Sequence, residues 1–273
     1  MKRDILVIKA DSLGPQYWAE LWKYRELFVV LVWRDIAVRY KQTVIGILWA
    51  LLQPVLMMLV FTLVFGRFAG FPSQAGAPYA ILVFSGLLGW NLFATSLADS
   101  SNSLIANASL VSKVYFPRMI VPAAAVVTAT VDFLISLCVL AALMIWYRFV
   151  PGWQIVLLPI FVFMAALTAL GPGLVLASLN VKFRDFRYII PFFVQIGLYV
   201  SPVGFSASVV PEQWQLVYSL NPMVAVIDGM RWCILGSPLR PTEFFVGAAV
   251  IAGLLGLGIF QFRREERQLA DLI

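Results

Sequence analysis

Residues 153–181 read WQIVLLPIFVFMAALTALGPGLVLASLNV and contain no charged side chain. A helix rises about 1.5 Å per residue, so about 20 apolar residues are enough to cross the hydrocarbon core of a bilayer. This run exceeds that length, and it belongs to a chain of 273 residues that is 62% hydrophobic and only 12% charged. Because soluble domains are about one quarter charged, the stretch predicts a membrane-spanning helix in an integral membrane protein.

On either side of this stretch, five further segments have the length and apolarity of spans. The six predicted spans are 44–66, 78–103, 119–147, 153–181, 189–206 and 243–262. The segments between them carry Pro, Gly and charge, which interrupt helices. We therefore expect an all-α polytopic membrane protein with six transmembrane helices. It is divided into an N-terminal region 1–43, a six-span domain 44–263 and a tail 264–273.

The Lys and Arg residues predict the orientation of these spans. If the N-terminus is cytoplasmic, 16 of the 20 basic residues fall in cytoplasmic segments, and the other side holds only Arg67, Arg148, Arg231 and Arg240. Positive charge concentrates in the cytoplasmic loops of membrane proteins. The chain is therefore predicted to lie in the cytoplasmic (inner) membrane, with both termini on the cytoplasmic side. This orientation explains the net charge of +6 better than binding to nucleic acid does.

Residues 16–40 precede the first span and have a helical pattern of their own. They follow Pro15, and proline is favoured at the start of a helix. One face of the predicted helix carries Trp18, Leu21, Trp22, Val29, Val32 and Ile36. Charges at both ends argue against a span, so we expect an amphipathic helix lying in the cytoplasmic interface. It either anchors the chain or also shapes a docking surface.

Residues 204–242 are broken by Pro211, Pro222 and Pro238 but remain apolar in between. They predict two short re-entrant helices on the extracytoplasmic side, between spans five and six. Such backbone is tolerated in a membrane only where protein or a water-filled cavity covers it.

Motifs for catalysis and nucleotide binding are missing. The sequence lacks the P-loop pattern G-x-x-x-x-G-K-[ST], the H-E-x-x-H zinc motif and the G-x-S-x-G nucleophile motif. It has no histidine and no cysteine spacing suited to zinc. Its 14 acidic residues are scattered rather than paired for acid–base chemistry. We therefore expect no catalytic residue, no metal and no cofactor on this chain.

Two carboxylates stand inside predicted spans. Asp132 lies near the middle of the third span, where a carboxylate costs about 2.5–3.5 kcal/mol to insert. It is expected to bond to a neighbouring helix, to line a polar path or to relay protons. Asp99 lies near the cytoplasmic end of the second span, and the polar residues 100–103 that follow it predict the end of that helix.

Aromatic residues inside the spans are candidates for a substrate path. Trp and Tyr usually collect at the two membrane interfaces. Those within predicted spans either pack against lipid or, if clustered around a pore, stack on sugar rings. With Asp132, the candidates are Trp49, Phe61, Phe65, Trp90, Phe93 and Tyr199.

Four stretches, in this order, resemble a single protein family. They read RYKQTVIGILWALLQP at 39–54, LVSKVYFPRMIVP at 110–122, LNVKFRDFRYIIP at 179–191, and SPVGF, VVPEQW and SLNPM within 201–223. The chain resembles, over roughly residues 16–263, the permease subunits of type-2 ABC exporters for polysaccharide. That family includes exporters of O-antigen, capsule and teichoic acid.

The resemblance implies a homodimer that pairs with two copies of a separate ABC ATPase subunit, which would bind ATP and Mg. It implies a polysaccharide cargo carried on an isoprenoid diphosphate lipid. It also implies that two cytoplasmic loops touch the ATPase. The coupling candidates in these loops are Asn107, Lys113, Tyr115, Phe116, Pro117, Arg118, Arg184 and Asp185.

A diphosphate head group would favour basic residues near the cytoplasmic entrance, where Arg39, Lys41, Arg184 and Arg187 are candidates. The positive-inside distribution explains these residues equally well. Two other functions stay open. One is a type-2 exporter of a lipid or drug. The other is a membrane-embedded glycosyltransferase, which the missing histidines and clustered acids disfavour.

Overall fold

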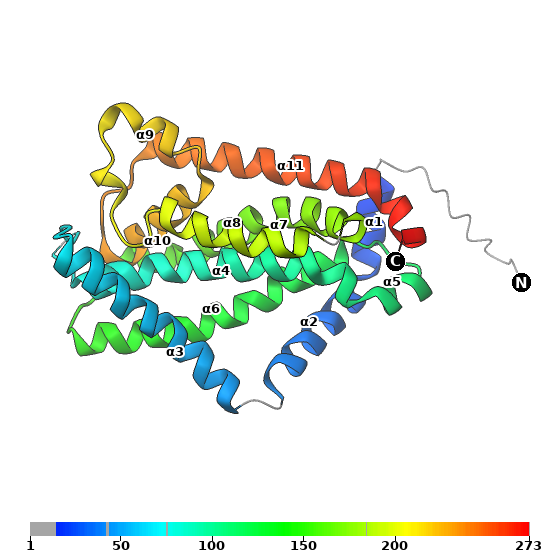
Figure 1. Cartoon of the computed structure of the whole chain (residues 1–273), viewed down its shortest axis with the longest axis horizontal. Helices are drawn as coiled ribbons and strands as arrows, with labels where there is room; N and C mark the ends of the chain where they lie inside the picture. The colour runs from blue at the N-terminus through cyan, green and yellow to red at the C-terminus, as the bar shows by residue number, and fades with distance from the viewer. Residues whose placement is uncertain (1–14, 42–43, 75, 184, 273) are drawn as a thin grey trace, which may run out of the picture.

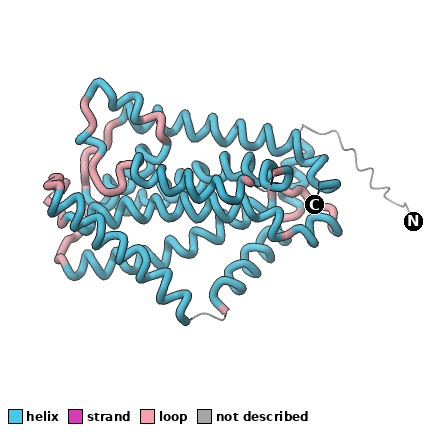
Figure 2. Tube along the Cα trace, in the orientation of Figure 1, coloured by secondary structure: helices cyan, strands magenta, loops and turns pink. Residues whose placement is uncertain are grey.

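The computed structural model describes residues 15–41, 44–74, 76–183 and 185–272, and within these ranges the chain is helical with no β-strand (Figures 1 and 2). Among the described residues, five helical segments are long and apolar enough to cross a membrane. They are Leu51–Phe68, Tyr79–Ala106, Ile120–Trp146, Trp153–Lys182 and Pro241–Glu266. This agrees with five of the six predicted spans, to within a few residues at most of their ends.

The long helices are α3 (Val44–Phe61), which continues as the π-helix η1 (Thr62–Phe68), then α4 (Tyr79–Ala106), α6 (Ile120–Trp146), α7 (Leu158–Lys182) and α11 (Pro241–Leu272). A 3-10 turn, η2 (Trp153–Leu157), leads into α7. Helix α4 lies at the centre and packs against α3, α6, α7 and α10. Of the 18 consecutive residues that are most apolar, 78% are buried in α4, against 17% in α3–η1 and in α11. The peripheral helices therefore present most of their apolar surface outward.

The fifth predicted span, 189–206, is represented by the shorter helix α8 (Phe186–Val200). At about 1.5 Å per residue its 15 residues reach about 22 Å, less than the hydrocarbon thickness of about 30 Å. Residues 201–206 are not helical. Whether α8 crosses the membrane, and with it a total of six spans, therefore stays a prediction.

Two short helices follow α8, as expected for residues 204–242. The 3-10 turn η3 (Ala207–Val209) leads to α9 (Glu212–Tyr218) and α10 (Pro222–Leu235). Helix α10 is largely buried against α4, α7 and α11. It begins at Pro222 with Asn221 as its N-cap, since the Asn221 side chain accepts a bond from the backbone N–H of Met223.

The segment before the first span is kinked, so the prediction of one continuous helix over 16–40 was wrong. Helix α1 (Pro15–Lys23) ends at Tyr24, whose ψ of 18° departs from helical geometry, and α2 (Arg25–Tyr40) begins after it. Leu31 faces the bundle, while Trp18, Trp22 and Trp33 point outward. The kink lets both helices follow the end of the bundle. Their position at a membrane interface stays a prediction.

The interpretation of residues 100–103 as a helix end was also wrong, because α4 continues to Ala106. The polar side chains there donate hydrogen bonds to backbone carbonyls of their own helix. Ser103 donates to the carbonyl of Ser100 at 2.7 Å, and Asn102 donates to that of Ala98 at 2.9 Å. Such local bonds allow a polar run to stay inside a helix.

One end of the bundle gathers α1, α5 (Ala108–Lys113) and the last turns of α11, at the right of Figure 1. We call it the basal end. A second apolar core lies there, formed by residues from seven helices. Its most buried members include Tyr17, Leu31, Leu104, Phe116, Leu174 and Phe262. The opposite end holds α9 and the loop after η1.

Candidate functional site

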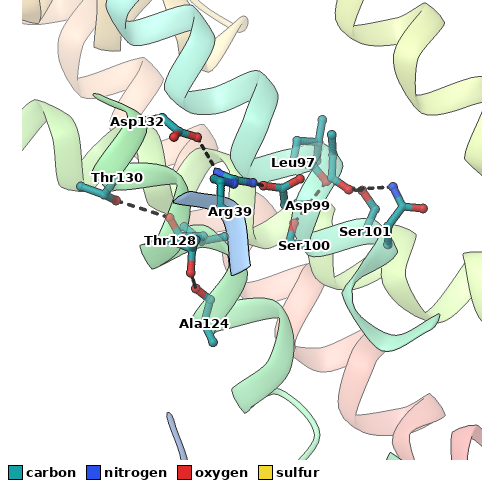
Figure 3. Close-up of polar contacts among 12 residues, drawn as sticks. Arg39, Leu97, Asp99, Ser100, Ser101, Ala124, Thr128, Thr130 and Asp132 are labelled. Atoms are coloured by element: carbon teal, nitrogen blue, oxygen red, sulfur yellow. Dashed lines mark hydrogen bonds and ion pairs between the residues drawn. The ribbon is translucent and has the colours of Figure 1, made fainter. Parts of the chain in front are cut away.

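A cluster of charged side chains joins α2 to two long helices (Figure 3). Nη1 of Arg39 lies 2.5 Å from Oδ2 of Asp132 on α6, and its Nη2 pairs with Asp99 on α4. The hydroxyl of Tyr40 also donates to Asp132. Each of the three charged side chains is about one third exposed. We call this group the Arg39 clamp.

The Arg39 clamp includes Asp132, for which the sequence left three roles open. The structure shows a bond to a neighbouring helix, and the polar path and the proton relay stay predictions. Burial alone would lower the pKa of Arg39, but Asp99 and Asp132 outweigh it and raise the pKa, so the guanidinium stays charged. The guanidinium is paired with two carboxylates of the same chain. The other entrance candidates, Lys41 and Arg187, are exposed.

The coupling candidates of the first loop divide into buried and exposed residues. Phe116 is 3% exposed and lies in the basal core, and Pro117 beside it is also buried. Tyr115 is 55% exposed, and Lys113 is exposed as well. The exposed residues Lys113 and Tyr115 are therefore held in place by the buried residues Phe116 and Pro117 that follow them.

Polar bonds tie this loop to the rest of the basal end. The backbone N–H of Arg118 donates to Oε1 of Glu266 on α11 at 2.7 Å, and its guanidinium donates to the Glu266 carbonyl. Asn107 accepts a bond of 2.6 Å from Arg34 on α2. The segment 107–118 is thus held at one end to α2 and at the other to α11.

The second predicted loop is shorter than expected, since α7 ends at Lys182 and α8 starts at Phe186. Lys182 forms an ion pair with Glu265 on α11. Asp185 is exposed, and Arg184 lies outside the described residues. The first loop and the last residue of α7 therefore both contact α11, through its neighbouring acidic residues Glu266 and Glu265.

The aromatic candidates form two groups. The ring of Phe61 on α3 lies 5.3 Å from Phe65 and stacks with Tyr199 of α8 at 6.2 Å. Phe61 is buried, whereas Tyr199 is 57% exposed. Further rings, Phe71 and Phe205, extend this group.

Trp90 and Phe93 make the other group on α4, with centroids 5.3 Å apart. They line a cavity of about 220 Å³ between α4, α7 and α8. Trp90 fits there because Gly197 on α8 has no side chain, since a Cβ would meet the indole at 2.6 Å. The side chain of Trp49 lies outside those that the structure describes.

Arg231 on α10 was counted in the sequence only as an outside charge, but its side chain is fully buried. It donates to the carbonyls of Val203 at 2.9 Å and Phe205 at 2.8 Å. Tyr79 donates to the carbonyl of Gly204 at 2.5 Å. The non-helical segment after α8 is therefore held by side chains of α4 and α10. The sequence signal that could have indicated this role is the pair Asp228 and Arg231, one helical turn apart within the mainly apolar stretch 223–235.

Comparison with known proteins bears on these sites. Residues 26–235 match the family model described as ABC-2 type transporter. The chain is 31% identical over 252 residues to the O-antigen export system permease protein RfbA of Myxococcus xanthus, covering 90% of this chain and 96% of that relative. A protein of the same name from Klebsiella pneumoniae is 27% identical over 244 residues, or 86% of this chain and 91% of its own length.

The polysialic acid transport protein KpsM of Escherichia coli is 20% identical over 249 residues, covering 85% of this chain and 91% of that protein. The family match includes the Arg39 clamp, the segment 107–118 and Arg231, and it ends before Glu266. The similarity therefore extends over nearly the whole arrangement described above.

Proposed function

Because the chain belongs to the ABC-2 type transporter family, we propose that it is the transmembrane subunit of an ATP-driven exporter of isoprenoid-diphosphate-linked polysaccharide. The observation that carries this is the 31% identity to a permease named for O-antigen export, over 96% of that protein. A more distant relative is named for polysialic acid transport. The cargo class is therefore polysaccharide, in preference to a drug or free lipid.

The chain works as a homodimer with two copies of a separate ABC ATPase subunit. Exposed apolar side chains support a partner copy, because α3 and α8 carry many of them on their outer faces. The missing P-loop is consistent with ATP and Mg being bound on another chain. The basal end faces the cytoplasm, and the chain crosses the inner membrane six times with α8 as the fifth span.

The segment 107–118 is the element that touches the ATPase. Its exposed Lys113 and Tyr115 offer the contact, and Phe116 is buried directly behind them. A push on this segment would reach α11 through the bonds between Arg118 and Glu266, and α2 through Arg34 and Asn107. ATP binding would then bias the spans between two arrangements.

The aromatic group around Phe61 and Tyr199 contributes to the sugar path. A second copy placed against α3 and α8 would bring an equivalent group opposite the first. Sugar rings stack on aromatic faces without requiring a fixed sequence of sugars. At the cytoplasmic entrance, Lys41 and Arg187 are exposed cations that suit a diphosphate.

Reconstitution tests the proposal. The chain is purified with its ATPase, placed in vesicles with a lipid-linked polysaccharide, and transport is followed by access of an external lectin. We expect transport that needs ATP and stops when the P-loop lysine of the ATPase is replaced. ATP hydrolysis by the chain alone, sugar transfer without a partner, or transport of only a lipid or drug would contradict the proposal.

A further inference from the structure

A long apolar groove lies on the outside of the bundle between α6 and α7. Both helices pack extensively along α4 and much less against each other. The groove between them has a volume of about 470 Å³ and is lined almost entirely by apolar atoms. Thr130 is the polar residue of its lining, and its hydroxyl faces the carbonyl of its own helix at Val126. The groove therefore suits hydrocarbon rather than water or a polar ligand.

The lining of the groove is long enough for an extended hydrocarbon chain. Its lining extends on α6 from Ala123 to Leu137 and on α7 from Leu158 to Leu170. At about 1.5 Å per residue these stretches are about 21 and about 18 Å long. An apolar cavity of about 150 Å³ holds one benzene ring. By proportion, the groove has room for about eighteen carbons in a line.

The basal end of the groove is marked by α2. Phe28 lines the groove there, and Arg25 lies one helical turn before Phe28. Residues three apart lie on the same side of a helix. Arg25 is exposed, with its guanidinium 5.6 Å from the ring of Trp22. Exposed tryptophans beside cations are typical of the head-group level of a membrane.

We propose that this groove holds one acyl chain of an anionic glycerophospholipid, with the lipid phosphate at Arg25. The two spans forming the groove place it at the depth of the hydrocarbon core. Basic residues at the head-group level attract anionic lipids. The site is distinct from the aromatic group of α3 and α8, and it does not depend on which cargo the protein exports. The bound lipid fills the space that α6 and α7 leave open and supports their position on α4.

Photolabelling tests the site. The full chain is reconstituted in phosphatidylcholine vesicles that contain phosphatidylglycerol with a diazirine on one acyl chain, and labelled peptides are mapped by mass spectrometry. We expect labels concentrated on the groove-facing residues of α6 and α7. Labels spread evenly over the exposed faces of α3, α8 and α11 would overturn the proposal.

Matched variants sharpen the result. Ala123→Phe fills the groove and should reduce labelling about fifteenfold, since displacing about two methylenes costs about 1.6 kcal/mol. Ala142→Phe makes the same change on an exposed part of α6 outside the lining and should leave labelling unchanged. If Ala123→Phe does not fold, Ala166→Leu narrows the groove from the opposite wall. Unchanged labelling in a folded filling variant would overturn the proposal.

A separate set of variants and probes tests the contact with the lipid head group. Arg25→Ala should reduce labelling by phosphatidylglycerol about fivefold, because one basic residue contributes about 1 kcal/mol to anionic-lipid attraction. Arg148→Ala, at the opposite end of α6, should have no effect. A photoactivatable isoprenyl phosphate should label the groove weakly. Strong labelling of the groove by that probe, without labelling by phosphatidylglycerol, would overturn the assignment to a glycerophospholipid.

Discussion

Nη1 of Arg39 lies 2.5 Å from Oδ2 of Asp132, which joins a helix outside the predicted spans to the interior of α6. Asp99 on α4 shares the same guanidinium. One cation thus connects three helices and satisfies two carboxylates that would otherwise be costly to insert. The arrangement makes the position of α2 depend on the packing of α4 and α6.

Replacing Asp132 with Asn should be tolerated. The amide keeps an oxygen that accepts from Arg39 or Tyr40, and Asp99 still balances the guanidinium. We expect a loss of about 1–2 kcal/mol in stability, typical of weakening one charged hydrogen bond, with export preserved. Thermal unfolding in detergent and the transport assay measure the two effects. Full loss of export from a well-folded Asp132→Asn protein would instead indicate a charged role in transport.

The double variant Asp99→Asn with Asp132→Asn should behave very differently. It leaves Arg39 without a carboxylate of the clamp, and breaking a buried ion pair costs about 3–5 kcal/mol. The cost here is smaller than that for a fully buried pair, because these side chains are about one third exposed. We expect less folded protein than either single variant yields. If the decrease in unfolding temperature equals the sum of two small decreases in the single variants, the two carboxylates act independently.

Phe116 and Tyr115 are neighbours with opposite environments, so their alanine variants should separate stability from docking. Phe116→Ala removes a buried ring and should cost about 3–5 kcal/mol. Tyr115→Ala removes an exposed ring and should leave the unfolding temperature nearly unchanged while weakening binding to the ATPase subunit. Co-purification and thermal unfolding, compared for both variants, check this. A stable Phe116→Ala protein, or an unstable Tyr115→Ala protein, would show that the roles are assigned wrongly.

The sequence predicted the helices well because length and apolarity alone decide whether a segment spans a membrane. Spans 119–147 and 153–181 agree with their helices almost to the residue. The sequence-based prediction failed where polar side chains could find hydrogen-bond partners either inside a helix or at its end. The polar residues after Asp99 bond back to their own helix, and periodicity does not distinguish this from a helix end.

The sequence predicted individual residues of the candidate site but not the contacts between them. Tyr115 and Phe116 were placed together by resemblance, but their different burial depends on a core built from distant segments. Arg39 was selected as an entrance cation, and its pairing with Asp99 and Asp132 arises from helix packing that charge counting does not contain. Arg231 was missed because an arginine between spans normally reports only topology.

Two glycines on α11 provide a matched test of helix packing. A Cβ on Gly258 would lie 2.2 Å from the carbonyl oxygen of Gly171 on α7, whereas a Cβ on Gly256 meets nothing within 4 Å. Gly258→Ala should force α11 and α7 apart and lower the unfolding temperature, since small residues permit close helix contact in membranes. Gly256→Ala should be neutral or stabilise by about 0.5–1 kcal/mol. Equal effects of the two substitutions would contradict the close contact.

Arg231 should be required for the segment that follows α8. Its two Nη atoms reach the carbonyls of Val203 and Phe205 together, a geometry that the single ammonium of lysine does not reproduce. Arg231→Met keeps a long side chain but leaves both carbonyls without this donor, and each unsatisfied buried group costs about 1–3 kcal/mol. Removing the buried charge recovers part of this cost, so the net loss of stability should be smaller than the two bonds suggest.

The local effect distinguishes this role better than global stability does. In Arg231→Met, residues 201–206 should become accessible to protease and exchange their backbone amides faster, while α6 and α7 stay protected. Arg231→Lys should give an intermediate result. Arg240→Met, which removes a partly exposed arginine paired with Glu243, is the control and should leave the segment protected. If Arg231→Met also leaves residues 201–206 protected, the bonds from Tyr79 to Gly204 and from Asn221 to Ser201 are sufficient to hold the segment without the arginine.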